Sequence, residues 1–279
     1  MIATKLSTTS ITVAKAMAVC GAMLALPING EADTSYLINN TTADAFIASG
    51  SANNPLGSDL TSLNFGDAGA LALAPASSTK GAFDSIIKFN TAAAVAQFNS
   101  TYGAGNWTIT GLTLSLASNF GVQGAQPSNN LFNTINGGSF GIDWLANDSW
   151  VEGTGSASGT PGYPNNSLVS FNSISTLFSA GSAELGTYTY TPPGNNVYLN
   201  YSLPLDGSLL SDAAGGGDVS FYFYAADNQV SYLFNSRTGA SNRPELTLTA
   251  TTVPEPGALA LLAAGLGGFL ISRRQKGTN

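Results

Sequence analysis

Residues 197–205 read VYLNYSLPL, and this stretch decides the fold class. Its apolar side chains, from Val197 to Leu205, occupy every second position, which is the period of a β-strand with one buried face. The same alternation recurs along the chain, with turn-forming residues between the predicted strands. The other clear examples are GLTLSLAS at 111–118, SFGIDWLA at 139–146 and ELTLTA at 245–250.

Helical patterns are scarce, and the two candidates are TAAAVAQF at 91–98 and the short stretch 174–178. Strands joined by long loops rich in Gly, Pro, Ser and Asn predict an all-β fold, an antiparallel, jelly-roll-like β-sandwich over residues 33–250. Within it, VSFYFYAAD at 219–227 is apolar or aromatic on both faces. Two interpretations stay open: a strand that is covered on both sides, or one that presents tyrosines to a ligand.

The first 32 residues have the pattern of a signal peptide. Lys5 and Lys15 form a basic segment before an apolar run, AMAVCGAMLAL at 16–26. This run is too short to span a membrane comfortably. A proline ends the run, so we predict an N-terminal signal helix and a mature chain that starts near Asp33. Cys20 lies inside the run as a small apolar residue, and the body after it has no cysteine and therefore no disulfide.

The composition of the chain excludes several functional classes. It has no histidine, which removes Ser-His-Asp catalysis, histidine zinc sites and histidine acid–base chemistry. Only 9% of its residues are charged. Between residues 33 and 253, four basic residues stand against fourteen acidic ones, a net charge of −10. Nucleic acid is therefore not expected as a partner, because binding to it needs clustered basic side chains.

The chain closes with VPEPGALALLAAGLGGFLISRRQKGTN at 253–279. Pro254 and Pro256 keep the start of this segment extended. The following run at 257–271 is apolar throughout and slightly shorter than an ordinary membrane-spanning helix. Arg273 and Arg274 behind it would stay in the cytoplasm, which places the body on the other side of the membrane. We predict a single hydrophobic helix here, and an ordinary anchor with a proline-rich stalk is the alternative.

This ending resembles the PEP-CTERM sorting signal, with Pro254, Glu255, Pro256, the apolar run and the arginine pair Arg273 and Arg274 in the matching places. The resemblance covers the C-terminal segment, residues 251–279. It implies recognition by an exosortase in a Gram-negative bacterium that makes extracellular polysaccharide. The partners it implies are the exosortase, the export machinery and, transiently, the inner membrane. The cell surface or extracellular matrix would be the destination.

Several stretches of the body, in order, resemble the DNRLRE family of secreted β-sandwich domains. The name-giving stretch of that family is not present as such. The resemblance implies a jelly-roll-like sandwich, with carbohydrate binding in some members and structural roles in others. The stretches that carry it are Asp44–Ile47, Asn64–Gly66, Ile86–Phe89, Thr110–Leu116, DSWVEGTG at 148–155 and FNSRTGASNRPELTLTA at 234–250.

The loop DSWVEGTG allows two interpretations. In the first, Trp150 covers an edge of the core and Glu152 accepts hydrogen bonds from the turn after it, so the loop is a structural clasp. In the second, Trp150 stacks on a sugar ring while Asp148 and Glu152 accept hydrogen bonds from its hydroxyls, with Trp144 nearby. For an acidic polysaccharide, the available anchors are Lys88, Arg237 and Arg243.

Metal binding and catalysis depend on the same acidic residues. Asp143 and Asp148 are the candidate metal ligands, and the sequence leaves a structural calcium ion open although no twelve-residue calcium loop is present. No other cofactor is expected. An enzyme acting on polysaccharide would need a pair of carboxylates, for which Asp143 and Glu152 are the candidates. We predict a protein that is not an enzyme and serves as a structural component or a polysaccharide binder of the matrix.

Overall fold

The computed structural model describes residues 32–54, 56–119, 132, 137–155, 168–191, 196–239 and 241–253. The predicted signal helix and C-terminal hydrophobic helix lie outside these residues. So do the sorting residues Pro254, Glu255, Pro256, Arg273 and Arg274. Within the described ranges, none of the helices combines the length and the apolar character needed to cross a membrane.

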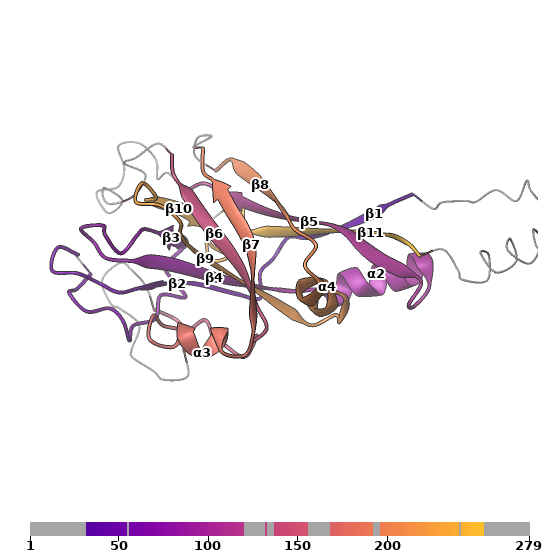
Figure 1. Ribbon diagram of the computed structural model, residues 1–279, viewed down its shortest axis with the longest axis horizontal. Helices are drawn as coiled ribbons and strands as arrows, with labels where there is room; N and C mark the ends of the chain where they lie inside the picture. Colours follow the sequence, from indigo (N-terminus) through magenta and orange to yellow (C-terminus); the bar gives the residue numbers. More distant parts are fainter. Residues whose placement is uncertain are drawn as a thin grey trace, which may run out of the picture. The chain divides into compact units, whose positions relative to one another are not determined.

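Two antiparallel sheets form the body (Figure 1). The four-stranded sheet has the order β1 (Thr34–Ile38), β11 (Glu245–Thr252), β5 (Trp107–Ala117) and β8 (Tyr198–Leu203). The five-stranded sheet has the order β2 (Ala43–Ala48), β4 (Phe83–Asn90), β9 (Asp218–Ala225), β6 (Ser139–Leu145) and β7 (Ser182–Thr189). A separate pair consists of β3 (Ala70–Leu73) and β10 (Tyr232–Asn235).

The order of the strands is that of a jelly roll. Along the chain, β1, β5, β8 and β11 go to one sheet, and β4, β6, β7 and β9 go to the other. The last strand, β11, lies between β1 and β5, and β9 lies between β4 and β6, which is the arrangement of two Greek keys. Strand β2 extends the five-stranded sheet at its edge. The predicted all-β, jelly-roll-like sandwich is therefore confirmed.

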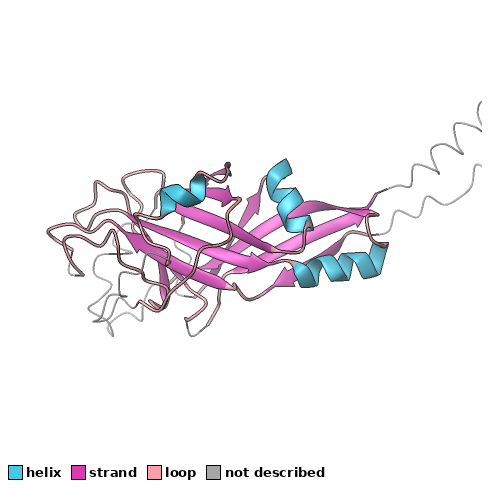
Figure 2. Ribbon diagram, turned by 90° about the horizontal axis from the view of Figure 1, so that it is seen from below, coloured by secondary structure: helices cyan, strands magenta, loops and turns pink. Residues whose placement is uncertain are grey.

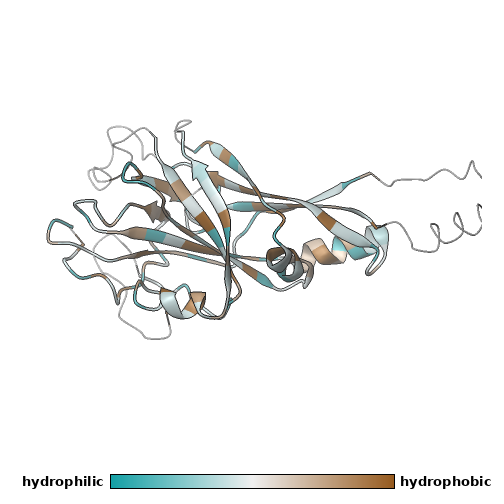
Figure 3. Cartoon of the chain, viewed as in Figure 1, coloured by the Kyte–Doolittle hydropathy of each residue, from teal (hydrophilic) through white to brown (hydrophobic). Residues whose placement is uncertain are grey.

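The main core lies between the two sheets. It consists of the alternating apolar residues predicted from the sequence, such as Leu114 of β5, Phe140 of β6, Phe221 of β9 and Leu246 of β11, all fully buried. Figure 3 shows the same alternation as brown and teal segments along the strands. Burial of these side chains supplies the main driving force for the fold.

Three helices are described, and two of them agree with the sequence prediction (Figure 2). Helix α2 (Ala92–Tyr102) packs Phe98 into the main core. Helix α3 (Ile174–Phe178) packs Leu177 into a second apolar cluster, which is described below. Helix α4 (Gly207–Ala214) was not predicted. The Asp206 carboxylate caps it by accepting from the backbone N–H of Ser208 at 2.9 Å.

The outward face of the five-stranded sheet is covered. A second apolar cluster lies on it, to which β2 contributes Ala45, β4 contributes Ile86 and β9 contributes Tyr222. Trp150 and Leu177 close this cluster from outside the sheet. The other side of β9, with Val219, Phe221 and Phe223, faces the main core. These contacts support the interpretation of VSFYFYAAD as a strand covered on both sides.

The outward face of the four-stranded sheet differs sharply, and we call it the hydroxyl face. Its side chains alternate with the buried residues of the main core, so they point away from it. Most of them are hydroxyl or amide side chains; several are exposed, others are half-buried, and Ser115 is buried. They are Ser35 and Leu37 of β1, Glu245, Thr247 and Thr249 of β11, Thr113 and Ser115 of β5, and Asn200 and Ser202 of β8.

Candidate functional site

The loop 148–155, which we call the clasp, crosses the covered face after β6. Trp150 in this loop is only 5% exposed and belongs to the second apolar cluster. Its indole N–H donates to Ser220 Oγ of β9 at 2.8 Å, and that hydroxyl donates to Asp148 Oδ1 at 2.5 Å. The ring therefore packs as a structural side chain, with its polar edge satisfied inside the protein.

Lys88 of β4 attaches the clasp to the sheet. Its ammonium group donates to the backbone carbonyls of Asp148 at 2.7 Å and of Trp150 at 3.1 Å. It also lies 4.8 Å from the centroid of the Trp150 ring and 3.8 Å from Asp218 Oδ2. A lysine engaged in this way, and only 8% exposed, is a structural anchor for the loop.

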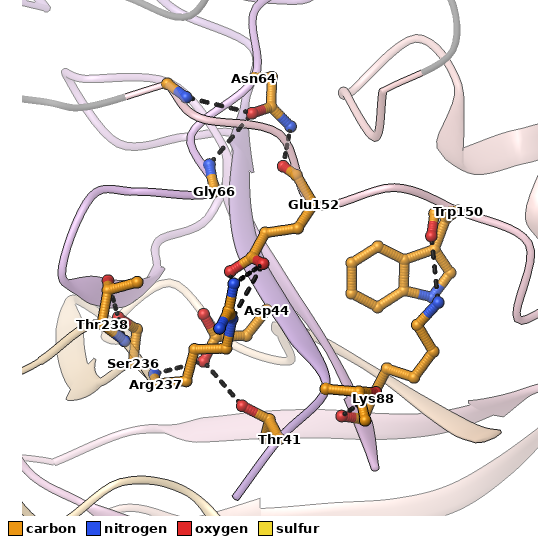
Figure 4. Close-up of polar contacts among 12 residues, drawn as sticks. Thr41, Asp44, Asn64, Gly66, Lys88, Trp150, Glu152, Ser236, Arg237 and Thr238 are labelled. Carbon is orange, nitrogen blue, oxygen red and sulfur yellow. Dashed lines mark hydrogen bonds and ion pairs between the residues drawn. The ribbon is translucent and has the colours of Figure 1, made fainter. Parts of the chain in front are cut away.

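Glu152 and Arg237 form the second attachment of the clasp (Figure 4). The Nε–H of Arg237 lies 2.7 Å from Oε1 and 2.9 Å from Oε2 of Glu152, and its Nη2 group also donates to Oε2. The backbone N–H of Arg237 donates to Asp44 Oδ2 of β2 at 2.6 Å. One arginine therefore links the clasp to the edge strand of the sheet.

Asp44 is the most perturbed carboxyl group of this cluster. Its side chain is fully buried, and its Oδ1 atom makes no hydrogen bond within the described structure. Burial raises the pKa of Asp44 to about 7, although the hydrogen bond from Arg237 lowers it. Near neutral pH, a substantial fraction of Asp44 is thus protonated, which leaves Arg237 chiefly to Glu152.

Asn64 fastens the loop from the other side. Its amide group donates to the backbone carbonyl of Glu152 and to that of Val169, the latter at 2.8 Å. Its Oδ1 accepts from the backbone N–H of Gly66 at 3.2 Å. A Cβ atom on Gly66 would lie 2.2 Å from the Glu152 carbonyl oxygen, so this close approach requires glycine.

Residues from four of the sequence stretches singled out above meet at the clasp. Asp44, Asn64, Lys88 and Arg237 come from four of those stretches, and each contacts the clasp or a residue bound to it. The sequence prediction marked these positions separately. The contacts among them join residues far apart in the chain, such as Arg237 and Asp44. A local sequence pattern does not predict such a pair.

Trp144 occupies a different site. It is 7% exposed and donates its indole N–H to Asp212 Oδ2 of α4 at 2.8 Å. It lines an open groove of about 710 Å³ beside α4, together with Asp212 and small residues. Burial raises the pKa of Asp212, the Trp144 hydrogen bond lowers it, and Asp218 raises it further. The sequence analysis did not single out Asp212.

The two candidate metal ligands have different surroundings. Asp143 on β6 pairs in register with Glu184 of β7, and burial, with Glu184 second, raises the pKa of Asp143 to about 6. Asp148 accepts from Ser220 and lies near Lys88 and Asp218, and burial raises its pKa to about 6. Among the residues described here, no group of three or more His, Cys, Asp or Glu side chains is placed to hold a metal. Calcium binding stays a prediction.

The candidate catalytic pair is also separated. Glu152 lies against Arg237 and near Asp44 of β2, whereas Asp143 belongs to β6. The sheet order is β2-β4-β9-β6, and three spacings of about 4.8 Å put roughly 14 Å between β2 and β6. Glu184, which the sequence analysis did not select, is the carboxylate next to Asp143.

A jelly-roll body followed by a short C-terminal segment is thus the architecture of this chain. The family model described as the PEP-CTERM protein-sorting motif matches residues 252–274. This match confirms the PEP-CTERM sorting signal predicted at the C-terminus. The predicted sorting residues Pro254, Glu255, Pro256, Arg273 and Arg274 lie within the matched range, and their individual roles stay predictions. It supports an exported protein that an exosortase sorts to the cell envelope of a Gram-negative bacterium. No curated protein matches the chain.

Proposed function

We propose that this chain is a non-catalytic structural component of the cell surface or extracellular matrix, associated with exopolysaccharide. The sorting motif at 252–274 carries this proposal, because it marks the sandwich as cargo for export. The C-terminal segment would hold the protein transiently at the inner membrane until an exosortase processes it. The sandwich would then be the part that works outside.

The contacts of the clasp support the non-catalytic part of this proposal. Glu152 is held by Arg237, Trp150 by Ser220, and Trp144 by Asp212. A glycosidase needs two carboxylates on either side of one bond, separated by about 5–9.5 Å. Glu152 is engaged by Arg237 near β2, whereas Asp143 lies on β6, three strands away from β2 in the sheet order. The acidic residues therefore act best as parts of the scaffold.

We also propose a DNRLRE-like sandwich, which rests on the resemblance of the sequence stretches alone. In that proposal, the loop 148–155 is a structural clasp that fixes β2 to the rest of the sheet. The second interpretation, in which Trp150 stacks on a sugar, would require the ring to leave a cluster in which it is 95% covered. We therefore assign Trp150 and Glu152 to the clasp.

Sorting can be tested with the full chain in a Gram-negative host with and without its exosortase. We expect a shortened, surface-exposed form in the first host and an uncut form in the inner-membrane fraction of the second. The double variant Pro254→Ala/Pro256→Ala should behave in the normal host as the wild type does without exosortase. Mass spectrometry of the C-terminus measures both results. Identical processing in the two hosts would refute exosortase sorting.

Association with the matrix needs a separate experiment. Cells that display the protein are treated with glycosidases that degrade their exopolysaccharide, and the release of the protein is followed by immunoblotting. We expect release in step with loss of the polymer, and retention in mock-treated cells. If the protein stays on stripped cells in full amount, it is held by another component and the polysaccharide association is wrong.

A further inference from the structure

The hydroxyl face has a central row whose polar groups are unused. The register places Leu37 beside Thr247, Thr247 beside Thr113, and Thr113 beside Ser202, so the row crosses all strands of the sheet. Within the described residues, the three hydroxyl groups of this row make no hydrogen bond to other parts of the protein. Each can both donate and accept, so the row is open to a ligand with the same capacity.

The flanking rows hold this surface in place. On one side, Ser35 Oγ and Thr249 Oγ1 lie 2.8 Å apart and form a hydrogen bond across β1 and β11. On the other side, Ser115 Oγ donates to Asn200 Oδ1 at 2.8 Å. Glu245, the one charged side chain in the defined face, accepts from the Tyr198 hydroxyl at 3.0 Å. The surface is therefore rigid and nearly free of charge, which lowers the entropy lost on binding.

The negative charge of the body favours a neutral ligand over an acidic one. Lys80 is 6% exposed and donates to Ser231 Oγ, Lys88 holds the clasp, and Arg237 is bound to Glu152. Among the cations of the described body, Arg243 is then the exposed one, and it stands against fourteen acidic residues between positions 33 and 253. An acidic polymer would meet repulsion, whereas a neutral polymer pays no such cost.

We infer that the hydroxyl face binds a neutral polysaccharide laid across the row Leu37, Thr247, Thr113 and Ser202. Sugar hydroxyls would pair with the free hydroxyl groups, and the methyl groups of the threonines and Leu37 would contact the C–H surface of the rings. Single contacts of this kind are weak, so firm attachment comes from many repeats and many copies of the protein. This inference rests on the proposed association with exopolysaccharide and names its class and its surface.

The test compares the full chain, in one detergent buffer, with the double variant Thr247→Val/Thr113→Val. Valine keeps the shape and the strand preference of threonine and replaces each hydroxyl group with a methyl group. The probes are microcrystalline cellulose, cross-linked dextran and galactomannan as neutral polymers, and alginate as an acidic one. The control variant Thr187→Val/Thr189→Val changes two exposed threonines of β7 in the other sheet. Thermal unfolding checks that all three proteins are folded.

We expect the wild type and the β7 control to bind a neutral polymer equally, with little binding to alginate. The Thr247→Val/Thr113→Val variant should bind about tenfold more weakly, since each neutral hydrogen bond contributes a factor of roughly two to ten. Equal binding by that variant would overturn the assignment of the surface and leave the association intact. Binding to alginate alone would overturn the neutral class. If no polymer binds, this inference fails, and the proposed association is decided by the release experiment on intact cells.

Discussion

The polar side chains on the two outward faces of the sandwich differ in whether they make hydrogen bonds within the protein. On the five-stranded sheet, Lys88, Ser220 and Asp148 are consumed by hydrogen bonds that attach the clasp. On the four-stranded sheet, the hydroxyl groups of Thr247 and Thr113 make no hydrogen bond within the described residues. The comparison teaches that a cluster of charged and aromatic residues can be structural, and that unpaired polar groups can lie instead on a plain surface of threonine, where we propose binding.

The largest effect should come from removing the ring that the covered face buries. Trp150→Ala deletes a 95% covered indole, together with its hydrogen bond to Ser220 and its ring contact with Lys88. We expect the free energy of unfolding to fall by about 3–5 kcal/mol, as for other buried aromatic residues. Denaturant unfolding measures this value. A loss below 1 kcal/mol would mean that Trp150 does not belong to the core, and the sugar-stacking interpretation would return.

A smaller effect is expected at the second attachment of the clasp. Arg237→Met leaves the Glu152 carboxylate, whose side chain is only 10% exposed, without its ion pair. Because 38% of the Arg237 side chain is exposed, the cost should be about 2 kcal/mol, below that of a fully buried pair. The double variant Arg237→Met/Glu152→Leu should recover part of the loss, because it removes the unpaired charge. Additive losses in this cycle would argue against direct coupling.

A pH dependence of stability is expected from Asp44, which accepts a hydrogen bond from Arg237 beside the clasp. The pKa of Asp44 is raised to about 7 in the folded protein and is near 3.9 when unfolded, so the folded state binds more protons between these values. The contribution of Asp44 to stability is therefore largest below pH 4 and is lost as the pH rises to about 7. Unfolding at pH 5.5 and pH 8 should show the more stable protein at pH 5.5. Asp44→Asn should flatten this difference, and a steeper one in the variant would contradict the assignment.

The smallest effect is expected on the hydroxyl face. Thr247→Ala removes a side chain that makes no hydrogen bond within the described residues, so only strand preference is lost. The free energy of unfolding should change by less than about 1 kcal/mol. If Thr247→Ala costs as much as Trp150→Ala, the hydroxyl face is part of the structural framework and the contrast between the faces disappears.

The fold could be predicted because many strands are buried on one face only. Leu112, Leu114 and Leu116 alternate with polar residues for that reason, and β5 follows the pattern. Helix α4 escaped prediction because its eight residues lie between an aspartate and a glycine-rich turn that are typical of a loop. Its formation depends on the Asp206 cap and on burial of Leu209 in the main core.

The candidate site was only partly predictable. Trp150 and Glu152 stood out by their residue types beside glycine. Ser220 did not, because a serine in an aromatic strand gives no sign that it will link an indole to a carboxylate. The sequence also offered Lys88 and Arg237 as ligand anchors. Their engagement with the clasp depends on contacts between segments 60 or more residues apart, which a local pattern does not contain.

The position of β11 ties the completion of the fold to the order in which the chain is exported. Residues 245–252 lie between β1 and β5, so the first strand has no partner in its sheet until the last one arrives. The sorting motif begins at residue 252, where β11 ends. If the chain crosses the membrane from its N-terminus, the four-stranded sheet can be completed only after residues 245–252 have crossed, directly before the sorting motif.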